Sequence, residues 1–73
     1  MKRNYVYGVQ VWNGQELVGN YFNEPDWHDR RKDAVRAARI AAVEYKGQAD
    51  RVTICKFYRA DAEYMANVLK ITI

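Results

Sequence analysis

The chain has 73 residues, with twelve Lys or Arg, nine Asp or Glu and a single cysteine. This length allows one domain with one small core and excludes a second domain with a linker. One cysteine cannot form an internal disulfide, no apolar run approaches the roughly 20 residues of a membrane span, and the first residues lack the pattern of a signal peptide. We therefore expect one cytoplasmic domain over residues 1–73.

The first predicted element is a strand from Tyr5 to Trp12, whose side chains alternate in character. Asn13 and Gly14 follow, and this pair is the strongest short hairpin signal because both residues tolerate positive φ in a type I′ turn. A two-residue turn there predicts the pairs Trp12 with Gln15, Val11 with Glu16 and Val9 with Val18. A one-residue bulge at Gly14 would instead exchange the two faces of the second strand.

One face of this hairpin is richer in large apolar side chains, and we assign it to the core beneath the helix. That face comprises Tyr5, Tyr7, Val9, Val11, Val18 and Phe22. The other face comprises Val6, Gly8, Gln10, Trp12, Leu17, Gly19 and Tyr21. The same register places Gly8 opposite Gly19, which predicts a flat spot that a partner could approach closely.

A loop is predicted from Asn23 to Asp29, because Pro25 disfavours helical geometry in the residue before it. Trp27, near the end of this loop, has two interpretations. It either packs onto the first helical turn or stands exposed as an anchor for a partner.

The most regular segment runs from Asp29 to Gly47 and is predicted to be a helix. Its apolar face is mostly alanine, which lets a helix lie close to a sheet; the face comprises Ala34, Ala37, Ala38, Ile40, Ala41 and Tyr45. Asp26, Asp29 and Asp33 are the candidate N-caps. Gly47 is the expected C′ residue.

The opposite helix face is basic and carries Lys32, Arg36, Arg39 and Lys46, with Val43 among them. Residues 30–39 hold five of the twelve basic side chains and one of the nine acidic ones, which leaves the rest nearly neutral, with seven against eight. A local stripe of this kind fits contacts with phosphates or with an acidic protein surface. It also fits an ordinary solvated helix face.

Two further strands are predicted, from Arg51 to Tyr58 and from Val68 to Ile73. Residues 60–67 fit either a helical turn capped by Asp61 or a wide loop and the start of the last strand; we favour a hairpin with an irregular connection. The predicted order is β-β-α-β-β. This is an α+β fold, an antiparallel sheet with one helix packed on one face.

Chemistry-bearing residues are few. His28 with Asp26 and Asp29 is the one cluster that resembles an acid–base or metal site, yet a zinc site needs more ligands. Cys55 as a nucleophile would need His28 as its base, and a buried strand cysteine is the more ordinary interpretation. The glycines are too scattered for a phosphate-binding loop. We therefore expect no catalytic residue, no metal and no cofactor.

Nucleic-acid binding is compatible with the isoelectric point of about 9.2, the basic stripe and the tyrosines. The βαββαβ order of an RNA-recognition sheet and the patterns of helix-turn-helix and zinc-finger domains are missing. Sequence-specific recognition is therefore not predicted, whereas contacts with phosphates remain open.

The stretch DAVRAARIAAVEY from Asp33 to Tyr45, with Gly47 and the strand start at Arg51, resembles the helix-to-strand segment of small basic phage anti-CRISPR proteins of the type I-F kind. The resemblance covers residues 33–54 and carries over no functional residue. It implies a non-enzymatic inhibitor that occupies a charged surface of a CRISPR surveillance complex and interferes with DNA binding.

We therefore predict a small non-enzymatic, phage-type inhibitor that binds a host nucleic-acid-handling complex in the host cytoplasm. The predicted partner-binding residues are Arg31, Lys32, Arg36, Arg39, Trp12, Trp27 and Tyr21. The partner would be a host protein or ribonucleoprotein, with contacts to nucleic-acid phosphates and none to a membrane. The alternatives are a non-specific DNA- or RNA-binding accessory protein, or a structural module that homodimerises through its last strand, Leu69 to Ile73.

Overall fold

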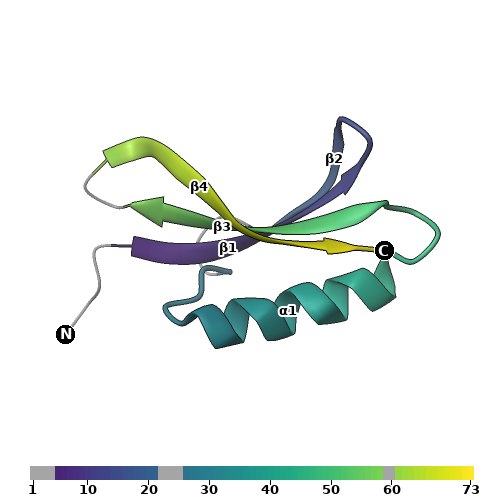
Figure 1. Cartoon of the computed structure of the whole chain (residues 1–73), viewed down its shortest axis with the longest axis horizontal. Coiled ribbons are helices and arrows are strands. Elements are labelled where there is room, and N and C mark those ends of the chain that lie inside the picture. The colour runs from purple at the N-terminus through teal and green to yellow at the C-terminus, as the bar shows by residue number, and fades with distance from the viewer. Residues whose placement is uncertain (1–4, 22–25, 59–60) are drawn as a thin grey trace.

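The structure is a computed structural model that describes residues 5–21, 26–58 and 61–73, with residues 61–66 described by their backbone alone. Its elements are β1 (Tyr5–Asn13), β2 (Glu16–Tyr21), α1 (Arg31–Glu44), β3 (Arg51–Tyr58) and β4 (Asp61–Thr72). The strands form one antiparallel sheet in the order β2-β1-β3-β4, and α1 lies along one face of it (Figure 1). The predicted α+β class and β-β-α-β-β order are confirmed.

The core lies between α1 and the sheet. Ala34 and Ala38 are fully buried, and they face valines and an isoleucine of the two central strands. Short alanine side chains bring the helix close to the sheet, as the sequence predicts. Ile40, however, was assigned to the buried face and is 53% exposed. The reason is that α1 packs on β1, β3 and β4 but not on β2, so the flank that carries Ile40 has no strand beneath it.

The helix begins later than predicted and without a side-chain cap. Arg30 is the N-cap residue, and its carbonyl oxygen accepts hydrogen bonds from the N–H groups of Asp33 and Ala34. The predicted aspartate caps are therefore wrong, although Asp33 in the first turn complements the helix dipole. The helix ends at Glu44 with Tyr45 as its C-cap, so Lys46 occupies the C′ position that was predicted for Gly47. Gly47 lies one residue further on, where it takes a φ of 86°.

The β1–β2 register differs from the predicted one. Gly14, with a φ of 63°, and Gln15 form the turn, and the observed pairs are Asn13 with Glu16, Trp12 with Leu17, Val11 with Gly19, Gln10 with Asn20 and Val9 with Tyr21. The register shifts between Val11 and Trp12, so Val18 is an extra residue on β2, a β-bulge.

The bulge changes which residues share a face. Gly19 and Tyr21 lie on the helix side, opposite to the predicted arrangement, because each pairs with a valine that faces α1. The predicted placement of Gly8 opposite Gly19 is also wrong, since Gly19 pairs with Val11. Val18 still packs against the core from the bulge. Phe22, the last residue of the predicted core face, lies outside the described residues.

The backbone of β4 is a strand from Asp61 onward, which excludes a helical turn over the described part of residues 60–67. Its pairing with β3 shifts register between Phe57 and Tyr58, so the hairpin is irregular near its connection, as favoured. Leu69, Ile71 and Ile73 pack against the core, and β4 is an edge strand. Within the described ranges, no helix combines the length and apolar character that crossing a membrane requires.

Candidate binding surfaces

The four predicted binding cations lie on the exposed surface of α1. Lys32, Arg36 and Arg39 occupy the side away from the buried alanines, and Arg31 is exposed at the first helical position. Val43 lies among them and is 76% exposed. We call these five residues the cationic face.

The cationic face is not neutralised within the described part of the chain. Among the described residues, one ion pair joins Arg51 to Asp50, and none of the four cations hydrogen-bonds or pairs with another described residue. Lys32 and Arg36 are like charges at i and i+4, a spacing that destabilises a helix slightly. The cationic face therefore lowers the stability of the helix slightly, and its N–H donors stay available to a partner.

Tyr21 lies on the same side of the sheet as α1 but beside the helix. Its hydroxyl is 2.9 Å from the hydroxyl of Tyr45, the C-cap residue of α1. This hydrogen bond raises the pKa of Tyr21 above its ordinary value, and burial, the ionised form of Tyr45 and the carboxylates of Glu44 and Asp26 raise it further. Tyr21 thus ties the edge strand β2 to the C-terminal end of α1.

Trp12 lies on the opposite face of the sheet, away from the cationic face. Its indole Nε1 donates a hydrogen bond of 3.0 Å to Thr53 Oγ1, and the guanidinium carbon of Arg51 lies 5.3 Å from the ring centroid. The seven predicted residues therefore do not form one surface. The structure brings the cations together and separates the tryptophans from them.

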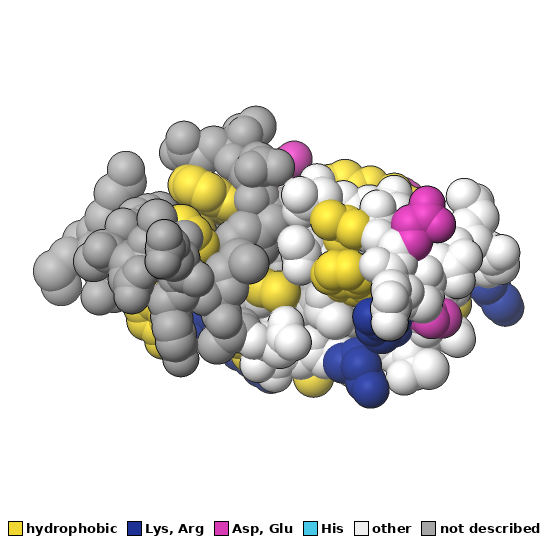
Figure 2. All heavy atoms as spheres, turned by 90° about the horizontal axis from the view of Figure 1, so that it is seen from above, with side chains coloured by type: hydrophobic (Ala, Val, Ile, Leu, Met, Phe, Trp, Pro, Cys, Tyr) yellow, Lys and Arg dark blue, Asp and Glu magenta, His cyan; other side chains and the backbone are white. Residues whose placement is uncertain are grey.

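The sheet face that carries Trp12, which we call the open face, is polar and hydrogen-bonded at its centre. The Cys55 sulfur lies 3.4 Å from Gln10 Oε1 and 3.3 Å from Asn67 Oδ1, so its single S–H can donate to either oxygen. Burial raises the pKa of this thiol, so it stays protonated. Figure 2 shows hydrophobic side chains next to Lys or Arg on this face. A hollow of about 330 Å³ there is lined by residues that include Trp12, Arg51, Thr53 and Lys70.

Trp27 stacks on Phe57 of β3, with ring centroids 5.8 Å apart and planes 24° apart. Phe57 alternates with Lys56 and Tyr58 and so belongs to the open face. Trp27 is half-buried there, and its Nε1 is buried without a hydrogen-bond partner among the described residues. Trp27 therefore packs against Phe57 on the open face of the sheet, not onto the first helical turn as one of its two interpretations predicted.

A cluster that the sequence did not single out joins Lys56 to tyrosines on the helix side of the sheet. The Lys56 Nζ lies 4.0 Å from the ring centroid of Tyr5 and 5.4 Å from that of Tyr58. Tyr5 pairs directly with Tyr58 across β1 and β3. The alternation of side chains within β1 and within β3 can be seen in the sequence. The register between the two strands, which pairs Tyr5 with Tyr58, cannot.

The residues considered for chemistry are separated by the sheet. His28 exchanges two backbone hydrogen bonds with Tyr7, of 2.8 and 2.9 Å, and its side chain lines a groove on the helix side with Asp26. Cys55 lies on the open face, so His28 is not positioned to act as its base. No three His, Cys, Asp or Glu side chains gather into a potential metal site within the described ranges.

Comparison with known proteins gives no further guidance: no family model matches the chain, and searches of curated proteins and of solved structures found no match. Functional inference therefore rests on the surfaces described above.

Proposed function

We propose that this chain is a non-catalytic binding protein that uses the cationic face of α1 to dock onto an acidic surface of a host nucleic-acid-handling complex. In the anti-CRISPR manner, that complex would be a CRISPR surveillance complex, and docking would interfere with its binding of DNA. The observation that carries the proposal is the row of exposed cations on α1 without partners among the described residues.

Two features of the helix support this role. Its buried side consists of alanines packed on the sheet, so the outward side chains are displayed on a rigid element. Arginine also suits such a surface because its planar guanidinium can bind a carboxylate or a phosphate through two parallel hydrogen bonds. Exposed Val43, one helical turn after Arg39, adds apolar area that a partner would bury.

The test is the double variant Arg36→Glu, Arg39→Glu, measured for binding to a purified type I-F surveillance complex by biolayer interferometry. Like-charge repulsion and lost hydrogen bonds should weaken binding by at least about tenfold, or roughly 1.4 kcal/mol. The matched control is Lys46→Glu, Lys70→Glu, which makes the same charge change at exposed positions, one beyond the end of α1 and one on β4. Equal affinity of both variants and the wild type would contradict the proposed surface, provided circular dichroism shows all three folded.

A second candidate, a non-specific accessory protein for DNA or RNA, is favoured by the hollow on the open face. Trp12 offers an aromatic ring and Arg51 and Lys70 offer positive charge, which together suit stacking of a base and contact with a phosphate. A salt titration with free duplex and single-stranded DNA separates the two candidates. Binding that weakens steeply with salt and is lost in Lys70→Glu favours this second function.

A further inference from the structure

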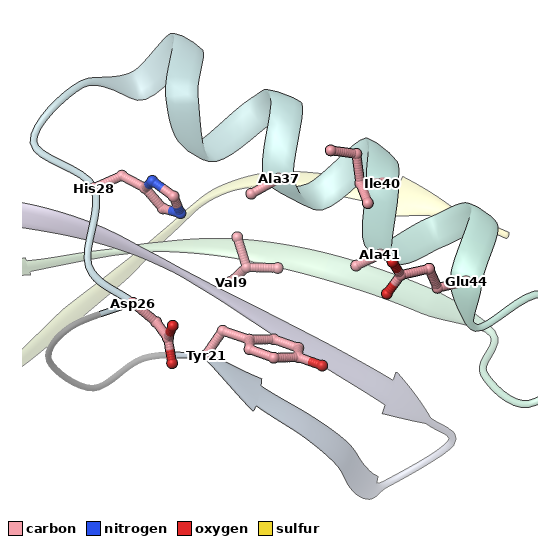
Figure 3. Close-up of a pocket in the computed structure, with 8 residues that line it drawn as sticks. All are labelled: Val9, Tyr21, Asp26, His28, Ala37, Ile40, Ala41 and Glu44. Carbon is pink, nitrogen blue, oxygen red and sulfur yellow. The ribbon is translucent and has the colours of Figure 1, made fainter.

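A groove runs between α1 and β2 on the helix side of the sheet (Figure 3). It exists because α1 lies over the other three strands and leaves β2 uncovered. Val9 forms its floor and is 2% exposed, while Ala37, Ile40 and Ala41 form the helix wall. The volume is about 350 Å³, at the lower end of the range of ligand pockets. We call this space the flank groove.

Two of the four polar side chains that line the flank groove are acidic. Figure 3 shows Glu44 at one end, Asp26 with His28 at the other, and Tyr21 along the side that faces the helix. None of the described lining residues is Lys or Arg, although basic residues outnumber acidic ones in the chain. The carboxylates are exposed, so the groove opens to solvent with its negative charge at the rim and its apolar surface at the base.

The same two carboxylates act on Tyr21, which also lines the groove. Next to its hydrogen bond with Tyr45, the causes that raise its pKa include the negative charges of Glu44 and Asp26. Two surfaces of opposite sign therefore flank α1, the cationic face outside and the flank groove beside β2. An anionic ligand would be repelled from the groove. A cation carried on an apolar chain would interact favourably with the acidic rim through its charge and with the apolar base through its chain.

We propose that the flank groove binds the side chain of a lysine presented by a partner polypeptide. The four methylenes of lysine would cover Ala37 and the exposed Ile40, and its compact ammonium would reach a carboxylate at the rim without the fixed geometry that a guanidinium needs. The ring of Tyr21 offers a further cation–π contact.

A polypeptide is favoured over a free amine because β2 is an edge strand of the sheet. No described strand pairs with its outer edge, so a partner segment can hydrogen-bond to the backbone of β2 while its lysine enters the groove. This site is independent of the cationic face, and its test does not use that face.

The experiment is an NMR titration of ¹⁵N-labelled full chain with a blocked tripeptide that has lysine between two glycines. Amide shifts should appear at groove residues such as Val9, Ala37 and Glu44. Binding should be at least tenfold weaker for the same tripeptide with norleucine, which keeps the stem and lacks the ammonium. The double variant Asp26→Asn, Glu44→Gln should bind the lysine tripeptide at least fivefold more weakly, whereas the control Glu16→Gln, an exposed carboxylate outside the groove, should bind like the wild type.

The remaining outcomes each overturn the proposal in a different way. Equal affinity for lysine and norleucine would make the groove a purely apolar site. n-Butylammonium binding as tightly as the lysine tripeptide would identify a site for free amines rather than for a polypeptide. Concentration-dependent self-association in sedimentation, lost in the Asp26→Asn, Glu44→Gln variant, would identify the occupant as a second copy of this chain. Thermal melts of all variants check that each is folded.

Discussion

The two faces of the sheet bury their side chains through different interactions. Under α1, Val9, Val11, Val52 and Ile54 are at most 2% exposed and pack against alanines. On the open face, Thr53 is 8% exposed but is held by a hydrogen bond from Trp12. Apolar packing dominates beneath α1, whereas hydrogen bonds between polar side chains lie at the centre of the open face. Ile54 and Thr53, which are neighbours on β3, therefore stabilise the fold in different ways: Ile54 by apolar packing and Thr53 by a hydrogen bond.

The largest expected effect is that of Ile54→Ala. Ile54 is fully buried, so the substitution loses burial and leaves a cavity, which should lower the free energy of unfolding by about 2–5 kcal/mol. Thr53→Val removes the acceptor of the Trp12 indole and should cost roughly 1 kcal/mol. Urea unfolding monitored by tryptophan fluorescence measures both.

Val43→Ala is the control for this comparison, because Val43 is 76% exposed and its loss should change stability by less than about 0.5 kcal/mol. A Thr53→Val cost as large as that of Ile54→Ala would mean that the two faces contribute equally to stability.

A smaller effect is expected at Gly19, where β2 approaches the end of α1. A Cβ at this position would lie 2.9 Å from the Tyr45 hydroxyl oxygen and 3.3 Å from Val11 Cβ. Gly19→Ala should therefore displace Tyr45, break its bond to Tyr21 and destabilise the fold by about 1 kcal/mol, although alanine is otherwise preferred to glycine in a strand.

The double variant Gly19→Ala, Tyr45→Ala tests the cause. Without the Tyr45 ring the cost of Gly19→Ala should fall by at least about 0.5 kcal/mol, measured as the coupling in a double-mutant cycle by thermal or urea unfolding. Simple additivity of the two substitutions would show that Tyr45 is not what excludes a side chain at Gly19.

The smallest effect is expected at the edge where the β1–β2 turn meets β3. Asp50 accepts a hydrogen bond of 2.9 Å from the Gly14 N–H and another of 2.9 Å from Arg51, and these lower its pKa from the ordinary 3.8. A lowered folded pKa contributes stability above the ordinary pKa, and that contribution is lost as the pH falls through the folded value. The stability advantage of the wild type over Asp50→Asn should therefore be present at pH 7 and shrink below about pH 4.

Urea unfolding at a series of pH values from 7 down to 2.5 measures this difference, and NMR titration of the Asp50 carboxyl gives its pKa directly. An advantage that stays the same at both ends of the series would show that the charge of Asp50 does not support the turn.

Local patterns in the sequence determined the order of the elements, the alanine side of the helix and the outward position of Lys32, Arg36 and Arg39, because periodicity within a segment fixes which residues share a face. Periodicity also placed Leu69 and Ile71 on one face of the last strand and Lys70 on the other. Helix ends were less well predicted, since Arg30 caps α1 through its backbone alone.

The tertiary structure alone decided what depends on pairing between distant segments. The bulge at Val18 turns Tyr21 toward α1, and the position of α1 over three of the four strands creates the flank groove. Trp12 and the cations of α1 are separated by the thickness of the sheet, which no spacing along the chain records. A one-residue change of register exchanges the faces of a strand, and that register is set by contacts across the fold, such as those of Asp50 and Arg51 with Gly14.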